Sequence, residues 1–169
     1  MKRPPHLQDI HVAQMMPSLE RRNTLRDLEA PLTLSPLEWP VYGQISSGFG
    51  MRQLGDLRRA HEGIDIPVPL GTPIKAAHGG VVAESCVYNG YGKTVVLDHG
   101  QGVKTLYAHC SKLLVRRGQR VEAGTVIAFA GETGRSTAAH LHFGVMIAGR
   151  FRDPVKLLKN ISPRLAQKR

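Results

Sequence analysis

Glycine and proline punctuate this chain so often that only short backbone elements fit between them. The 169 residues include 18 glycines and 11 prolines, and helix interiors tolerate neither residue well. Turn signals, such as Asn-Gly-Tyr-Gly at 89–92, separate short apolar runs. Short strands at this even spacing predict an all-β fold, with two antiparallel sheets that form a sandwich or open barrel with a groove.

The strand pattern begins near residue 39 and divides the chain into three parts. We expect a lead-in segment over residues 1–38 with a short helix at 18–29, a domain over residues 39–158, and a basic tail over residues 159–169. A second short helix is expected at 155–159. The predicted strands cover residues 41–47, 74–77, 81–83, 94–97, 103–109 and 140–147, and another lies within 121–130, after Gly124.

The charge of the chain limits the kinds of binding partner that we expect. A formal net charge of +10 favours a polyanion, which could be a nucleic acid, an anionic membrane surface or a cell-wall polymer. The strands lack the basic and aromatic interleaving of a base-stacking surface, so no nucleic acid is expected. No apolar run approaches the roughly 18 residues of a transmembrane segment, and no signal peptide is predicted in this sequence.

Two histidine motifs carry metal-ligand chemistry. His61 precedes Asp65 by four residues, and Gly63 between them permits a bend that could aim both side chains inward. His140 and His142 alternate with apolar residues, so on a strand both imidazoles point to one face. Burying two histidines without partners would be costly, so the pair is either a metal or catalytic motif or two partly exposed histidines whose hydrogen bonds are satisfied.

A third motif, Tyr107-Ala108-His109, ends another predicted strand, and strict alternation puts Tyr107 and His109 on one face. Catalytic zinc usually takes three protein ligands and keeps a fourth position for water. His61, Asp65 and one histidine of the 140/142 pair could supply the three ligands. His109 and the remaining histidine would then serve acid–base chemistry. The residues alone leave open which of the pair is the ligand.

These motifs, in this order and spacing, resemble the lysostaphin/LytM zinc metallopeptidases. The resemblance covers roughly residues 39–158 and includes Ser-Gly-Phe-Gly-Met-Arg at 47–52, His-Glu-Gly-Ile-Asp at 61–65, Tyr-Ala-His at 107–109 and the run 134–143 that ends in His-Leu-His-Phe. It implies the duplicated hybrid motif fold. It also implies one zinc ion held by His61, Asp65 and His142, with His109 and His140 catalytic.

The implied activity is hydrolysis of peptide cross-links or stem peptides of bacterial peptidoglycan. Peptidoglycan is then the expected partner, an activating or regulatory protein is a further one, and the cell envelope is the expected location. Three features differ from the common family pattern: Gly144 follows His-Leu-His-Phe where glutamate is frequent, Cys110 follows His109 where leucine is common, and residues 131–134 read Gly-Glu-Thr-Gly.

Three other readings compete with the enzyme. A non-catalytic LytM-like domain, which binds the wall or activates another hydrolase, would be expected to lack ligands, and all five positions are present. A lipoyl- or biotinyl-type carrier domain would leave the histidine motifs unexplained. A cysteine hydrolase using Cys110 with His109 is disfavoured because strand neighbours point to opposite faces. The spacing of Cys86 and Cys110 does not establish a disulfide.

Overall fold

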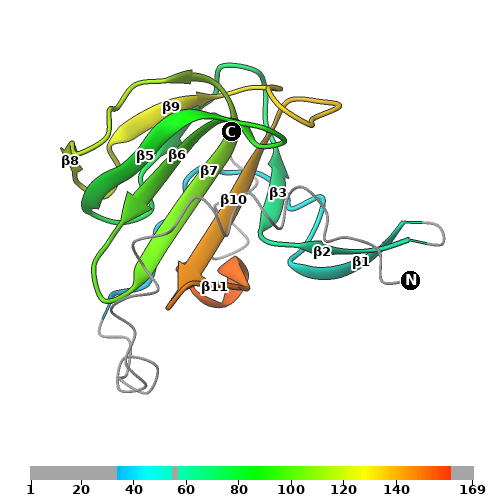
Figure 1. Ribbon diagram of the computed structural model, residues 1–169, viewed down its shortest axis with the longest axis horizontal. Helices are drawn as coiled ribbons and strands as arrows, with labels where there is room; N and C mark the ends of the chain where they lie inside the picture. Colours follow the sequence, from blue (N-terminus) through cyan, green and yellow to red (C-terminus); the bar gives the residue numbers. More distant parts are fainter. Residues whose placement is uncertain (1–33, 55–56, 161–169) are drawn as a thin grey trace.

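The computed structural model describes residues 34–54 and 57–160, and almost all of their regular structure is antiparallel sheet (Figure 1). The all-β prediction is confirmed, and the strand order within these residues shows no closed barrel. The elements are β1 (Gly50–Leu54), β2 (Leu57–His61), β3 (Ile64–Pro67), β4 (Pro73–Lys75), β5 (Gly80–Tyr88), β6 (Gly92–Asp98), β7 (Val103–Leu113), β8 (Arg120–Val121), β9 (Val126–Ala130), β10 (His140–Ile147), β11 (Arg150–Arg152) and the 3₁₀ turn η1 (Pro154–Lys156).

The two sheets are very unequal. A nine-stranded sheet runs in the order β11-β10-β7-β6-β5-β8, with β3 beside β10 and with β9 between β4 and β7. The second sheet is the β1–β2 hairpin alone, which extends away from the large sheet (Figure 1). His61 ends β2 and directly precedes the turn into β3, so the hairpin delivers this histidine to the edge where β3 pairs with β10.

One face of the large sheet is covered and forms the main core. Alternate residues of the central strands point to this side, and Leu97, Tyr107 and Phe143 among them are fully buried. The opposite face carries a smaller apolar cluster that includes Val96, Leu106 and Ala108. On β10, Leu141 and Phe143 point into the main core as predicted, which leaves His140 and His142 on the opposite face.

Strand β7 breaks its alternation at His109, and the prediction that Tyr107 and His109 share a face is wrong. Against β6, Tyr107 pairs with Val95 and Cys110 with Lys93, so β7 fits one extra residue into this interval. His109 takes a left-handed φ of 60°, which costs of order 1 kcal/mol or more for a residue with a side chain. This bulge turns the imidazole to the His142 face while Tyr107 and Cys110 stay in the core.

Two other local predictions are corrected. Residues 41–47 form no extended strand; they make one isolated bridge, Ser47 with Asp65. The helix expected at 155–159 is a single 3₁₀ turn, because Leu158 leaves it to pair with Leu37 in a parallel bridge. The helix expected at 18–29 lies outside the described residues. Within the described part of the chain, no helix is long and apolar enough to cross a membrane.

Candidate active site

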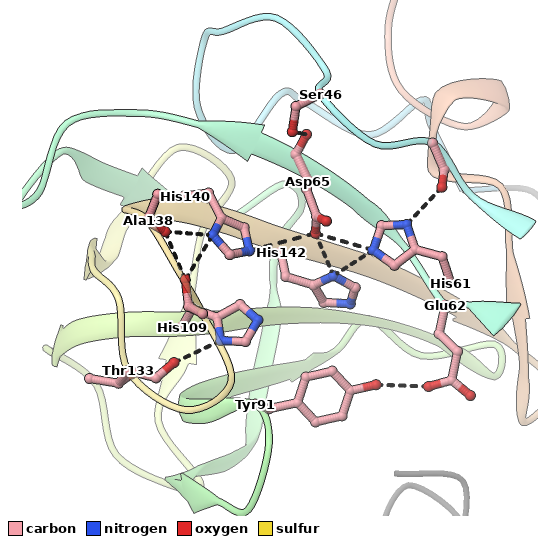
Figure 2. A network of polar contacts seen from close by, with 12 residues as sticks. Ser46, His61, Glu62, Asp65, Tyr91, His109, Thr133, Ala138, His140 and His142 are labelled. Atoms are coloured by element: carbon pink, nitrogen blue, oxygen red, sulfur yellow. Dashed lines mark hydrogen bonds and ion pairs between the residues drawn. The ribbon is translucent and has the colours of Figure 1, made fainter. Parts of the chain in front are cut away.

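Three of the five predicted site residues converge on one point. The Nε2 atom of His61 lies 3.1 Å from Oδ1 of Asp65, and Nδ1 of His142 lies 2.9 Å from the same oxygen. The two ring nitrogens are 3.2 Å apart. Figure 2 shows both imidazoles directed at the carboxylate. Strand register produces this convergence, because Asp65 on β3 is the direct pairing partner of His142 on β10.

Glycine permits the close approach of the two strands. A Cβ placed on Gly63 would overlap the carbonyl oxygen of Phe143 and come within 3.0 Å of the His142 ring. Any other residue at this position would therefore push the turn between β2 and β3 away from β10. The bend expected at Gly63 is present, and the close contact with β10 explains why glycine is needed there.

The tautomer of His61 is set by the segment that crosses above it. The Nδ1 of His61 donates a hydrogen bond of 2.7 Å to the carbonyl oxygen of Gly48. Residues 46–48 are in turn fixed by two backbone hydrogen bonds of 2.9 Å with Asp65, one through Ser46 and one through Ser47. Neutral His61 with its proton on Nδ1 presents a bare lone pair on Nε2.

This arrangement brings two acceptors, His61 Nε2 and an Asp65 oxygen, to 3.1 Å from each other. Two lone pairs at that distance repel unless a cation lies between them. A tetrahedral zinc ion with ligand bonds of about 2.0–2.1 Å has ligand atoms roughly 3.3 Å apart. The three donor–donor distances, 2.9, 3.1 and 3.2 Å, come close to that spacing. The donor set and its geometry therefore fit zinc.

Burial and charge support the same fit. His61 and His142 are 6% and 5% exposed. Burial raises the pKa of the Asp65 carboxyl, but the adjacent rings of His142 and His61 outweigh burial and hold that pKa well below its usual range. Burial also lowers the pKa of His142, which favours the neutral ring that a metal requires. An ionised carboxylate with two neutral imidazoles is the protonation state of a zinc ligand set.

His109 and His140 form a second group beside the first, with ring centroids 4.7 Å apart. The Nδ1 of His109 donates to the Thr133 carbonyl at 2.7 Å, and the Nδ1 of His140 donates to the Ala138 carbonyl at 2.9 Å. Each neutral ring therefore keeps its lone pair on Nε2. For His140 this atom lies 3.7 Å from Oδ1 of Asp65. The structure thus brings all five predicted residues together in two groups.

His109 is held neutral by its surroundings. Burial lowers its pKa to about 4, against the opposite effect of its hydrogen bond to Thr133, and the neighbouring His142 and His140 lower it further. At neutral pH the Nε2 atom of His109 is therefore free to accept a proton. A free lone pair is one requirement for a general base, and the other is a pKa near the operating pH, which less burial would bring closer.

Sequence reasoning missed several residues that support the site. The Tyr91 hydroxyl donates to Oε2 of Glu62 at 2.7 Å, and the Tyr91 ring lies 5.5 Å from the His142 ring (Figure 2). The run 89–92 signalled only a turn, so Tyr91 carried no functional signal.

A Cβ at Gly144 would lie 3.1 Å from both the Glu62 carbonyl and the Phe151 ring, so a glutamate there would displace Phe151.

Another histidine, His99, lies outside this site. His99 is bonded through Nδ1 to the Gly79 carbonyl at 2.8 Å and through Nε2 to the Thr105 hydroxyl at 2.7 Å. The Thr105 hydroxyl also contacts the hydroxyl of buried Tyr107 at 2.9 Å. His99 and Tyr107 are therefore structural. Cys110 lies in the core on the face opposite His109, and Cys86 and Cys110 are both free thiols.

Fold and site together fit a hydrolase, because an antiparallel sheet collects three residues that could hold a metal ion, with two further imidazoles beside them. A family model, Peptidase family M23, matches residues 59–154. The chain belongs to this peptidase family, and the resemblance to lysostaphin-type enzymes is confirmed.

Curated relatives carry related names. Over 119 residues the chain is 44% identical to DD-carboxypeptidase/endopeptidase Mpg of Neisseria meningitidis and 39% identical to peptidoglycan DD-endopeptidase ShyA of Vibrio cholerae. Each match covers 69% of this chain and 27% of the relative, so the chain spans only about a quarter of the length of these proteins.

Solved structures agree with the fold. The catalytic domain of lysostaphin, an antimicrobial peptidase from Staphylococcus simulans, superposes with a TM-score of 0.65 at 35% identity, covering 70% of this chain and 93% of that domain. A zinc-containing peptidase from Vibrio cholerae gives a TM-score of 0.67 at 36% identity, covering 76% of this chain and 41% of that one.

Proposed function

We propose that this chain is a zinc-dependent endopeptidase that hydrolyses peptide cross-links or stem peptides of bacterial peptidoglycan. The observation that carries the proposal is the convergence of His61, Asp65 and His142, with two lone-pair atoms 3.1 Å apart. These three residues would hold one zinc ion. The names of the relatives Mpg and ShyA support peptide-bond hydrolysis, and the name of ShyA supports peptidoglycan as the substrate.

When bound, zinc polarises a peptide carbonyl and activates a water molecule for attack. The chain's own residues supply the proton chemistry. His109 and His140 direct Nε2 lone pairs away from their carbonyl partners, so this pair can accept a proton from water and return it to the departing amine. Once protonated, either imidazole can donate a hydrogen bond to the oxyanion.

The surrounding residues hold this machinery in place. Gly48 fixes the ring of His61, and the Tyr91–Glu62 hydrogen bond joins the start of β6 to the turn that follows β2. The net charge of +10 favours retention on an anionic wall or membrane, which fits an enzyme acting in the cell envelope. An activating or regulatory partner remains part of the proposal, with no residue assigned to it.

The three-part division also belongs to this proposal. Residues 39–158 are the peptidase domain, residues 1–38 are a lead-in, and residues 159–169 are a basic tail. The lead-in meets the domain at Leu37, which is 3% exposed and pairs with Leu158. The Nε1 of Trp39 donates to the Lys159 carbonyl at 2.8 Å, so the two boundaries lie side by side.

The test is release of fragments from purified peptidoglycan sacculi, read by mass spectrometry, with and without a zinc chelator. We expect release that stops with the chelator and returns with added zinc, and the fragment masses identify the bond that is cut. A protein that binds zinc but releases nothing from any wall preparation would contradict the proposed enzymatic activity. Stimulation of a second hydrolase by that inactive protein would establish the activator-type alternative.

A further inference from the structure

One connection supplies the hydrogen-bond acceptors for both histidines of the second group. Residues 131–139 join β9 to β10, and within them the carbonyls of Thr133 and Ala138 accept the Nδ1 protons of His109 and His140 (Figure 2). Near Ala138 the connection is held by Ser136, whose hydroxyl donates to the Ala138 carbonyl at 2.7 Å. The orientation of both imidazoles therefore depends on how firmly this connection is held.

Thr133 is the residue that ties the connection to the sheet. Its hydroxyl donates to the Cys110 carbonyl on β7 at 2.6 Å and accepts from the Lys93 amide on β6 at 3.0 Å. Its carbonyl accepts from the ring of His109 at 2.7 Å. A single residue thus connects two strands and one imidazole with three short hydrogen bonds.

The hydroxyl bonds lie where β7 is irregular. Cys110 follows the bulge at His109, and Lys93 is its pairing partner on β6. The extra residue in β7 displaces the regular ladder, so the Lys93 amide bonds to the Thr133 hydroxyl and the Cys110 carbonyl accepts from the same oxygen. Thr133 therefore satisfies two backbone groups that the bulge takes out of the sheet.

Backbone packing holds the same connection from the other side. A Cβ on Gly134 would overlap Gly92, and a Cβ on Gly92 would overlap Thr133. The Arg135 amide donates to the Gly90 carbonyl at 2.8 Å, and the His109 amide donates to the Tyr91 carbonyl at 2.8 Å. The 90–92 turn, the bulge and the 131–139 connection form one interlocked unit, and Thr133 is the side chain that bonds across it.

We propose that Thr133 is a positioning residue for His109. Its hydroxyl fixes the connection on the β7 bulge so that its carbonyl holds the Nδ1–H tautomer of His109 and leaves Nε2 free toward the metal-binding residues. The catalytic meaning of this role rests on the proposed function. The structural part does not rest on the proposed function: a hydroxyl sets the tautomer and orientation of one imidazole.

The experiment compares Thr133→Val, which removes the hydroxyl at nearly equal volume, with Thr133→Ser, which keeps it. Long-range ¹H–¹⁵N spectra of labelled protein report which ring nitrogen of His109 carries the proton, and His109→Gln assigns the signal. We expect the Nδ1–H form in the wild type and in Thr133→Ser. In Thr133→Val we expect its downfield proton to broaden or shift and the tautomers to mix.

Kinetics on a cross-linked peptide provide the second readout. Misplacing a catalytic group by about 1 Å costs up to about 100-fold in rate, so we expect Thr133→Val to lower kcat about 10- to 100-fold with little change in KM. Zinc content should stay at one ion per chain, because Thr133 contacts none of the three metal-binding residues in the described contacts. Thr133→Ser should retain most of kcat.

Thr105→Val is the matched control. This residue also lies on the large sheet, and its hydroxyl also contacts two partners, His99 and Tyr107, away from the site. It should lower the melting temperature as Thr133→Val does, while leaving kcat and the His109 signal unchanged. Should Thr133→Val not fold, Thr133→Ala, smaller and equally without a hydroxyl, carries the same expectations.

A His109 signal and kcat in Thr133→Val that match those in Thr105→Val would overturn the proposal. Failure of the proposed function looks different, since wild-type protein would then cleave nothing while its His109 spectrum still responded to Thr133→Val. The two conclusions can therefore fail separately.

Discussion

The two groups of histidines in this site are held by different means. His61, Asp65 and His142 lie on strands whose register brings Asp65 directly opposite His142. His109 and His140 take their orientation from carbonyls of the single connection 131–139. Strand register resists change, whereas a connection can be loosened by one residue. The comparison implies that metal binding and proton transfer can be separated by mutation.

The largest effect should come from the strand-held group. We expect His142→Ala and Asp65→Asn to lose the zinc ion and to lower activity by roughly four orders of magnitude or more, because a metal that stabilises charge contributes several kcal/mol to the transition state. Metal content measured by inductively coupled plasma mass spectrometry, alongside turnover of a cross-linked peptide, checks both effects. Retention of one zinc ion by His142→Ala would remove this residue from the ligand set.

The second group should show the complementary behaviour. His109→Ala and His140→Ala are expected to keep one zinc ion and to lose about 10²- to 10⁴-fold in kcat, the usual contribution of general acid–base catalysis. The same two assays apply. Loss of zinc from His109→Ala, combined with its retention in His142→Ala, would exchange the roles assigned to the two groups.

The same contrast explains which parts of this site the sequence could predict. Simple alternation placed His140 and His142 on one face and Leu141 and Phe143 in the core, because β10 is regular from end to end. The same rule failed at His109, because its φ of 60° interrupts the alternation and the residue type alone does not predict that conformation. The bulge in β7 is bonded to Thr133, more than twenty residues further along the chain, and local periodicity does not report such contacts.

The supporting residues were hidden for a similar reason. Tyr91 and Gly92 were read as part of a turn, but their contacts are with Glu62 and Thr133, which come from other parts of the chain. The expected terminal helix failed because pairing of Leu158 with Leu37 outweighs local propensity. Motif spacing therefore identified the five side chains that the fold brings together, while the residues that orient them required the tertiary structure.

A smaller change tests whether strand approach controls the metal-binding group. In Gly63→Ala the new Cβ would overlap the Phe143 carbonyl, so β3 must move away from β10 and carry Asp65 with it. We expect a loss of about 1–3 kcal/mol in the free energy of unfolding, typical of overpacking, together with weaker zinc binding. Urea titration and competition with a zinc-sensitive dye measure the two quantities.

Gly79→Ala is the control for this change, because its nearest neighbour would be 3.6 Å from the new Cβ and its φ is not left-handed. This variant should be as stable as the wild type or slightly more stable. Equal zinc affinity in Gly63→Ala and Gly79→Ala would show that the strands have room to adjust, which would weaken the contrast between strand-held and connection-held groups.

The last prediction is a pH dependence of stability in the metal-free protein, and it probes the connection-held group. Burial lowers the pKa of folded His109 to about 4, against about 6.5 in an unfolded chain. Above pH 6.5 both states are neutral and the group contributes no pH dependence. Between about pH 6.5 and pH 4 the unfolded chain binds a proton that the folded chain does not. As the pH is lowered through this range, the free energy of unfolding therefore falls by up to about 1.4 kcal/mol per pH unit. Below pH 4 the loss is complete.

His142 and His99 have pKa values lowered by burial as well, so they add slopes of the same sign. Replacing His109 by glutamine should therefore make the wild-type slope shallower by up to about 1.4 kcal/mol per pH unit without removing it. Urea unfolding of chelator-treated protein at pH 7, 6 and 5 measures the difference, since bound zinc would otherwise stabilise the folded state by its own pH-dependent binding. Parallel slopes for the two proteins would mean that the His109 ring gains enough solvent to protonate in the folded state. The 131–139 connection would then hold the ring less firmly than its 2.7 Å hydrogen bond to Thr133 indicates.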